Sequence, residues 1–141
     1  MEKNIRLVIV DDHDILRRTW KMVLERDERI VVVAECASGA EAILCAEKDN
    51  PDVILMDVNM HPVNGFEATR KIIRAHPSIG IIGMSINNQP TYARNMIQSG
   101  ARGYVTKSSP SEEMILAIIT VFNGGTYICR EVKERMVDKQ F

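Results

Sequence analysis

The chain has 141 residues, a length that builds one domain around one hydrophobic core. Its hydrophobic content of 45% and charged content of 26% are ordinary for a globular protein, and its net charge of −1 excludes a general attraction to nucleic acid or anionic membranes. No stretch approaches the roughly 18 apolar residues that span a bilayer, and the N-terminus lacks a secretory apolar region, so we expect a cytoplasmic protein with no membrane partner.

The number and spacing of the cysteines also fit a cytoplasmic protein. Cys36, Cys45 and Cys129 are odd in number and show none of the paired spacings of disulfide frameworks or zinc sites. We therefore expect reduced thiols in the core or at the surface, as in cytosolic proteins, with a redox-sensing thiol as the alternative.

Strands and helices are expected to alternate along the chain. Apolar or β-branched runs predict five strands, at 5–10, 30–34, 53–57, 79–85 and 103–106. Helical spacing of apolar residues, with capping residues and glycine or proline stops, predicts five helices, at 14–25, 38–48, 64–76, 89–99 and 111–123. Serine or asparagine followed three residues later by glutamate predicts the starts of three of these helices, at Ser38, Asn64 and Ser109.

Five strand–helix units predict an α/β fold. Parallel strands need crossover helices, and right-handed crossovers place helices on both faces of the sheet. The tail after Gly125 does not continue the alternation. Ile128, Val132 and Met136 recur every four residues there, so residues 126–141 are expected to form a linker or an extra C-terminal helix after a domain at 1–125.

Polar residues follow the predicted strands. The first ends in Asp11 and Asp12, the third in Asp57 and the fourth in Ser85, and Lys107 follows the fifth. The carboxyl ends of parallel strands meet at one edge of the sheet, so three carboxylates would crowd there and repel one another. Mg²⁺ would relieve that repulsion, and an aspartate beside a metal ion and a lysine is suited to accept a phosphoryl group.

These residues also form a known series of motifs. Asp11-Asp12, Met56-Asp57, Met60 with Gly65, Ser85 and residues 103–107 occur in this order across residues 5–123. In them the chain resembles the receiver domain of two-component response regulators. The resemblance implies a flavodoxin-like, doubly wound, five-stranded parallel sheet of order 2-1-3-4-5 with five helices. Asp11-Asp12-His13 and residues 103–108 resemble the LuxR/NarL subfamily, whose members carry a C-terminal helix-turn-helix.

The resemblance implies a role for each matched residue. Asp57 would accept a phosphoryl group from a sensor histidine kinase, a phosphotransfer protein or a small phosphodonor. Mg²⁺ would be held by Asp12, Asp57 and the backbone carbonyl of Asn59, with Asp11 acting directly or through water. Ser85 and Lys107 would bind phosphoryl oxygens.

Signalling would follow from a change of shape. Tyr104 would turn inward when Ser85 moves, and residues 89–123 would form the output surface. The alternative for Tyr104 is a static, half-buried tyrosine. His13 is expected to be an ordinary residue at the start of a helix, with a role at the mouth of the site as the alternative. The expected output is transcription, with DNA bound only through a C-terminal domain absent from this chain, and with a possible homodimer.

Two departures from the family pattern concern rates rather than chemistry. His61 comes between Met60 and Pro62, so the loop beside Asp57 can follow a different path. Ile86 stands where the family usually has alanine or glycine, and it could shield a phosphoaspartate or hinder the donor.

Three other functions remain as alternatives. An unphosphorylated protein-interaction scaffold would keep the fold without the chemistry. An aspartyl-phosphate phosphatase would turn over a substrate, but its nucleophile is typically in a first-strand Asp-x-Asp, whereas here the first strand ends in Asp11-Asp12 and Asp57 is followed by Val58-Asn59. A flavin-binding module needs a glycine-rich phosphate cradle after the first strand, and the loop there lacks one. The expectation is therefore a signalling domain that promotes only its own phosphorylation and dephosphorylation, and not an enzyme.

Overall fold

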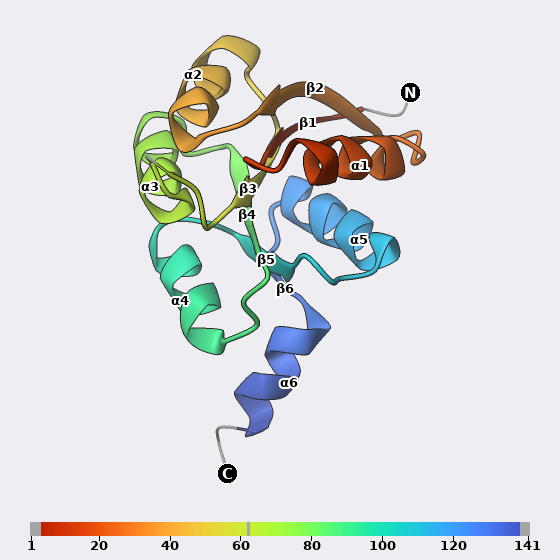
Figure 1. Cartoon of the computed structure of the whole chain (residues 1–141), viewed down its shortest axis with the longest axis vertical. Coiled ribbons are helices and arrows are strands. Elements are labelled where there is room, and N and C mark those ends of the chain that lie inside the picture. The colour runs from red at the N-terminus through yellow and green to blue at the C-terminus, as the bar shows by residue number, and fades with distance from the viewer. Residues whose placement is uncertain (1–3, 62, 139–141) are drawn as a thin grey trace.

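The computed structural model describes residues 4–61 and 63–138, which form one parallel sheet with helices on both faces (Figure 1). The strands are β1 (Ile5–Val10), β2 (Ile30–Cys36), β3 (Val53–Asp57), β4 (Gly80–Ser85), β5 (Gly103–Thr106) and β6 (Tyr127–Ile128). The helices are α1 (Asp14–Leu24), α2 (Gly39–Asp49), α3 (Gly65–Ala75), α4 (Pro90–Gln98), α5 (Ser111–Phe122) and α6 (Arg130–Asp138). Helices α1 and α5 cover one face, and α2, α3 and α4 cover the other.

The strand order is β2-β1-β3-β4-β5-β6, and each neighbouring pair is parallel. The flavodoxin-like architecture is confirmed, but the described chain has six strands and six helices where the domain was predicted to have five of each. The sixth helix, α6, lies in the tail for which a linker or an extra helix was expected. The sixth strand escaped prediction because it is only two residues long. It belongs to the sheet because Tyr127 N–H donates to the Arg102 carbonyl and Cys129 N–H to the Tyr104 carbonyl, each at 3.0 Å.

The central strands are buried on both sides. Every residue of β3 and of β4 is buried, as expected for strands covered by helices on both faces. Burial continues to the last residue of β3, where Asp57 has only 1% of its surface exposed. The strand therefore carries a carboxylate from the apolar core directly to the edge of the sheet.

Helix caps fix where the helices begin. Ser38 Oγ accepts a hydrogen bond from Glu41 N–H at 3.1 Å, and Asn64 Oδ1 accepts one from Glu67 N–H at 2.9 Å, so both predicted caps are confirmed. The predicted cap at Ser109 is wrong. Pro110 is the N-cap residue of α5 and makes no side-chain cap, while Ser109 Oγ accepts a hydrogen bond from Thr106 N–H at 3.3 Å.

Helix α3 begins directly behind the end of β3. A Cβ atom on Gly65 would lie 2.7 Å from Cα of Val58 and closer still to the carbonyl oxygen of Asp57, so a larger residue would displace that backbone. Gly65 N–H donates to the Val58 carbonyl at 2.9 Å. The glycine is therefore needed for the close approach that holds the backbone around Asp57.

The three cysteines carry free thiols. Cys36 and Cys129 are buried, and the Sγ atoms of Cys36 and Cys45 form a thiol contact at 2.8 Å. Burial raises the pKa of both Cys36 and Cys45, which makes the reactive thiolate scarce.

In the part of the chain that the structure describes, no helix has both the length and the apolar character needed to cross a membrane.

Candidate functional site

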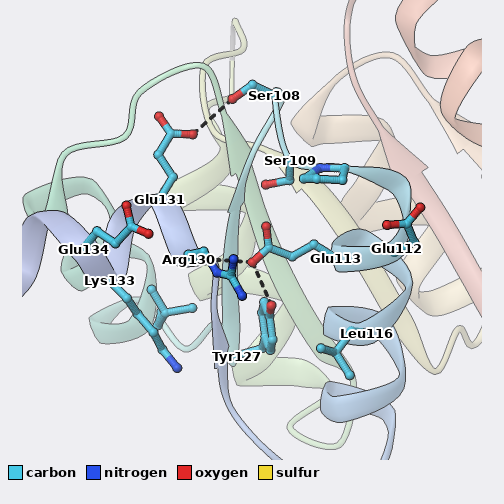
Figure 2. A pocket seen from close by; sticks show the side chains of 12 residues that line it. Ser108, Ser109, Glu112, Glu113, Leu116, Tyr127, Arg130, Glu131, Lys133 and Glu134 are labelled. Carbon is cyan, nitrogen blue, oxygen red and sulfur yellow. Dashed lines mark hydrogen bonds between the residues drawn. The ribbon is translucent and has the colours of Figure 1, made fainter.

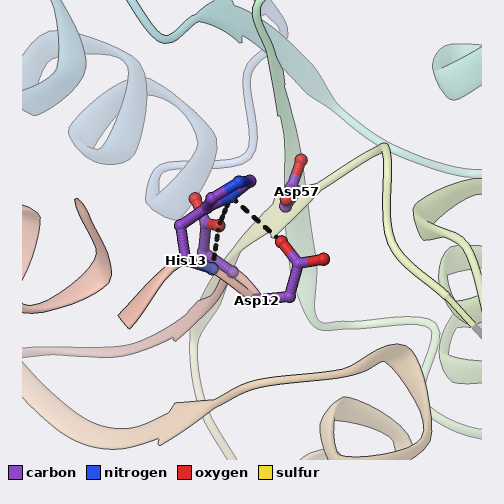
Figure 3. Close-up of side chains that lie close together, drawn as sticks. Asp12, His13 and Asp57 are labelled. Atoms are coloured by element: carbon purple, nitrogen blue, oxygen red, sulfur yellow. Dashed lines mark hydrogen bonds and ion pairs between the residues drawn. The ribbon is translucent and has the colours of Figure 1, made fainter. Parts of the chain in front are cut away.

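The carboxylates predicted to converge are brought together at the carboxyl edge of the sheet. Strands β1 and β3 are neighbours, so Asp11 and Asp12 lie beside Asp57. One potential ligand atom from each of Asp11, Asp12, His13 and Asp57 lies within 4.8 Å of all the others (Figure 3). Asp11 and Asp57 are buried, whereas Asp12 and His13 are exposed, so the cluster is open on one side.

Lys107 reaches the same cluster from the loop after β5. Its Nζ atom lies 3.1 Å from Oδ2 of Asp11 and 3.4 Å from Oδ2 of Asp57, and only 12% of the side chain is exposed. The Lys107 backbone N–H donates to the Ser85 carbonyl at 2.9 Å, which ties this loop to the end of β4. One ammonium group, mostly but not fully buried, therefore faces two buried carboxylates.

The cluster has capacity for another cation. Four buried side-chain atoms of the described residues have no hydrogen-bond partner, and two of them are Oδ2 of Asp11 and Oδ2 of Asp57. These are the same two oxygens that face Lys107. The ammonium of Lys107 compensates part of their negative charge, but it does not form a well-directed hydrogen bond with either oxygen. Buried carboxylate oxygens open toward solvent on one side suit a hard cation such as Mg²⁺, which uses one or two carboxylates and keeps several waters. The donor set therefore fits Mg²⁺.

The electrostatics of Asp57 reflect this crowding. Burial raises its pKa from 3.8 to about 6, and the charge of Asp11 acts in the same direction. Lys107 and a hydrogen bond from Asn59 N–H to Oδ1, at 3.2 Å, oppose the rise. Near neutral pH the carboxylate is mainly charged but poorly solvated, and it gains from any positive charge placed beside it.

The loop after β1 is held by Arg17, for which the sequence indicated no role, and by His13, which is the N-cap residue of α1 as expected of a helix-start residue. Arg17 on α1 is buried, and its Nη1 donates to the Asp11 carbonyl at 2.6 Å while its Nε donates to Glu35 at 3.2 Å. His13 N–H donates to Oδ1 of Asp11 at 2.9 Å, and His13 Nδ1 lies 3.1 Å from a carboxylate oxygen of both Asp11 and Asp12. No sequence signal separates Arg17 from a solvent-facing arginine, because its partners come from other elements.

Ser85 and Tyr104 lie on the neighbouring strands β4 and β5. Ser85 is buried, and its Oγ accepts a hydrogen bond from Asn87 N–H at 3.0 Å. Tyr104 is fully buried rather than half-buried, and its hydroxyl donates to the Asn87 carbonyl at 2.5 Å. Burial raises the pKa of Tyr104 to about 12, so the hydroxyl remains a donor. Both side chains therefore form hydrogen bonds with the backbone of Asn87, in the loop at residues 86–89.

One cavity, of about 520 Å³, is lined by Asp57, Ser85 and Lys107 together with neighbouring residues. Its polar lining comes from His13, Thr19, Asp57, Asn59, Ser85 and Lys107. Its apolar lining is Ile15, Leu16 and Ile86, and Ile15 and Ile86 are 84% and 82% exposed. His61 is exposed, and Pro62 lies outside the described residues. A larger cavity, of about 800 Å³, lies between α5 and the C-terminal segment and lacks the aspartate cluster.

Comparisons with known proteins agree with this geometry. Residues 7–119 match the family model of the response regulator receiver domain. The chain is 38% identical over 136 residues to the transcriptional regulatory protein DegU of Brevibacillus brevis, covering 96% of this chain and 58% of that protein. It is 38% identical over 137 residues to the response regulator GacA of Pseudomonas protegens, covering 97% of this chain and 64% of that protein.

The chain thus spans about three fifths of the length of these curated relatives, 58% and 64%. Among solved structures, a two-component response regulator of the LuxR family from Aurantimonas sp. SI85-9A1 matches with a TM-score of 0.93 and 30% identity. That match covers 98% of this chain and 99% of the other, so it includes the region of β6 and α6.

Proposed function

Because this chain belongs to the response regulator receiver domains of the LuxR/NarL type, we propose that it is switched by phosphorylation of Asp57. The observation that carries the proposal is Oδ2 of Asp57, a buried carboxylate oxygen without a hydrogen bond, 3.4 Å from the ammonium of Lys107. Such an oxygen is poorly solvated and directed at a positive charge, as a nucleophile for phosphoryl transfer needs to be.

The proposed reaction is a transfer from a phosphohistidine or an acyl phosphate. A carboxylate oxygen of Asp57 forms a bond to phosphorus while the bond from phosphorus to the donor's nitrogen or oxygen breaks, and the leaving group takes up that electron pair. Lys107 stabilises negative charge on the phosphoryl oxygens, and the hydroxyl of Ser85 donates to one of them. Asp11, Asp12, Asp57 and the Asn59 carbonyl would hold Mg²⁺, which supplies further positive charge to the transferring group when bound.

A protein donor fits the surroundings of the site. The cavity is bordered by the exposed side chains of Ile15 and Ile86 and the partly buried Leu16. An apolar rim around a charged centre suits a partner that presents an imidazole from an apolar surface, as a histidine kinase or phosphotransfer protein would. The free thiols are consistent with a cytoplasmic location for such an encounter.

The proposed output surface is α4, β5 and α5. A phosphoryl group adds about −1.5 to −2 charge. It would pull on Ser85 and Lys107 and, through the loop at 86–89 and Tyr104, bias this surface. Control of transcription, through a DNA-binding domain such as a transcriptional regulator carries, is part of the proposal, and a homodimer stays a prediction.

Acetyl phosphate tests the proposal directly. With Mg²⁺ present, the intact mass of the wild type should rise by one phosphoryl group, and the rise should vanish with a chelator or in Asp57→Asn. Asp52→Asn, on the same loop–strand unit, should label like the wild type. A folded wild type that takes no label from acetyl phosphate or a phosphohistidine donor would contradict the proposal and favour the scaffold function.

A further inference from the structure

The C-terminal segment, residues 127–136, packs as part of the domain. Strand β6 extends the ladder of β5, and Cys129 and Val132 are fully buried. Helix α6 contacts both α4 and β5, and Met136 packs against the core. The segment therefore lies on part of the proposed output surface.

Glu131, in the first turn of α6, makes the most hydrogen bonds of any carboxylate in this segment. One oxygen accepts from Asn88 Nδ2 at 2.6 Å. The other accepts from Thr106 Oγ1 at 2.9 Å and from Ser108 Oγ at 3.1 Å, the second of which Figure 2 shows. The hydrogen bonds from Asn88 and then Thr106 lower the pKa of Glu131, so the carboxylate stays charged near neutral pH.

The three donors lie beside the proposed phosphoryl-binding residues. Asn88 is on the loop between β4 and α4, which directly follows Ser85 and is called the Ser85 loop. Thr106, the last residue of β5, and Ser108 stand on either side of Lys107, where the loop between β5 and α5 begins; this is called the Lys107 loop. One carboxylate thus joins both loops.

We infer that Glu131 is a positioning residue that holds the Ser85 loop and the Lys107 loop together for the phosphoryl group, and thereby couples docking of α6 to occupation of the site. The inference rests on the proposed function. A phosphoryl group between Ser85 and Lys107 needs both loops in place at once, and loops that are already joined lose less freedom on binding. Since linkage is reciprocal, an occupied site must also strengthen the docking of α6.

A second attachment holds the segment without touching these loops. Oε2 of Glu113, on α5, accepts hydrogen bonds from the Tyr127 hydroxyl and from Arg130 N–H, each at 2.8 Å (Figure 2). Loss of Glu131 therefore removes the connection to the loops while this anchor and the burial of Val132 remain.

The test uses beryllofluoride with Mg²⁺ as a mimic of the phosphoryl group, and titration calorimetry as the readout. Glu131→Ala should weaken beryllofluoride binding about fivefold or more, the lower end of typical coupling between sites. The affinity of Glu131→Gln for beryllofluoride should lie between those of the wild type and Glu131→Ala. Its amide oxygen can accept a hydrogen bond from Thr106 or Ser108, but its NH₂ group cannot accept one from Asn88. The matched control is Glu134→Ala, one turn along α6, since the Glu134 carboxylate has no hydrogen bond or ion pair within residues 4–61 and 63–138. It should bind like the wild type.

Amide exchange supplies the reciprocal readout. In the wild type, beryllofluoride should slow exchange of the α6 amides, and in Glu131→Ala this slowing should be lost. A carboxylate that only stabilised α6 would change the basal exchange but would leave the affinity for beryllofluoride unchanged.

The outcomes separate the two proposals. If the wild type binds beryllofluoride and Glu131→Ala binds it equally well, the positioning role is wrong and the proposed function stands. If the wild type binds none at any concentration tested, both are wrong. Weakened binding in Glu131→Ala, with Glu134→Ala unchanged, supports both.

Discussion

The two ends of β3 carry aspartates in opposite situations. Asp52, just before the strand, is partly exposed, and its Oδ2 accepts a hydrogen bond from Arg6 N–H at 2.9 Å. Arg6 Nη2 in turn donates to the Asp49 carbonyl at 2.7 Å, so the surrounding polar groups are also paired. Asp57, at the other end, is buried, and its Oδ2 has no hydrogen bond.

The difference separates a carboxylate that supports the fold from one that the fold must tolerate. A paired, partly exposed carboxylate stabilises its turn, whereas a buried one with a bare oxygen costs stability. Asp57 also has Asp11 beside it, which raises that cost. Because burial outweighs the stabilising effects of Lys107 and the Asn59 hydrogen bond, the unbonded Oδ2 atoms of Asp57 and its neighbour Asp11 are the best indication of chemistry in the molecule.

The largest expected effect comes from removing the cation beside Asp57. Lys107→Ala should slow labelling by acetyl phosphate about 100-fold, the loss typical when one preorganised stabilising group is removed. Arg6→Ala, which removes a cation at the other end of the sheet, should leave the rate unchanged. Rates come from intact mass against time, and equal rates for Lys107→Ala and the wild type would remove Lys107 from the mechanism.

The second largest expected effect is on the pH dependence of the free energy of unfolding, which should differ between variants of Asp57 and Asp52. The pKa of Asp57 is about 6 in the folded protein and 3.8 ordinarily. The folded state therefore holds this proton more tightly than the unfolded state does, and the contribution of Asp57 to stability falls as pH rises from about 4 to about 6. Two pKa units correspond to about 3 kcal/mol as an upper figure.

Asp57→Asn should therefore raise the free energy of unfolding above pH 6, by up to about 3 kcal/mol, and should flatten its decline between pH 4 and 6. Asp52→Asn keeps an oxygen for Arg6 N–H and should change stability by less than about 1 kcal/mol. Urea unfolding at several pH values measures both. A destabilised Asp57→Asn at pH 7 would mean that the carboxylate supports the fold after all.

Mg²⁺ should stabilise the protein through Asp57, at the carboxyl end of β3, and not through Asp52 at its other end. At a concentration 100-fold above its dissociation constant, Mg²⁺ should stabilise the wild type by about 2.7 kcal/mol. Asp52→Asn should keep this gain and Asp57→Asn should lose most of it. Thermal melts with and without a chelator measure the effect, and an equal gain in both variants would place the ion elsewhere.

The smallest expected effect concerns the rim of the cavity. Ile86 is 82% exposed and lines the site, so Ile86→Ala should widen the opening and speed labelling by acetyl phosphate a few-fold. The matched control is Leu44→Ala, since Leu44 is an exposed apolar residue on α2 that does not line the cavity. A rate for Ile86→Ala equal to that of the control would remove Ile86 as a barrier to the donor.

The sequence was sufficient to predict the convergence of Asp11, Asp12, Asp57 and Lys107, because each directly follows or ends a strand and parallel strands end at one edge. It was not sufficient for Arg17 or Glu131, whose partners lie on other elements and whose side chains resemble solvent-facing residues of amphipathic helices. Nor did it predict β6, since two residues carry no periodicity. The sequence thus predicted most helices and strands, but not the side-chain contacts between them.

The most direct test of the central claim is the location of the phosphoryl label. Borohydride reduces an aspartyl phosphate to homoserine, which peptide mass spectrometry assigns to one position. After labelling with acetyl phosphate and Mg²⁺, homoserine should appear at position 57 and not at 11, 12 or 52. Homoserine at one of those three positions, with Asp57 intact, would contradict the account.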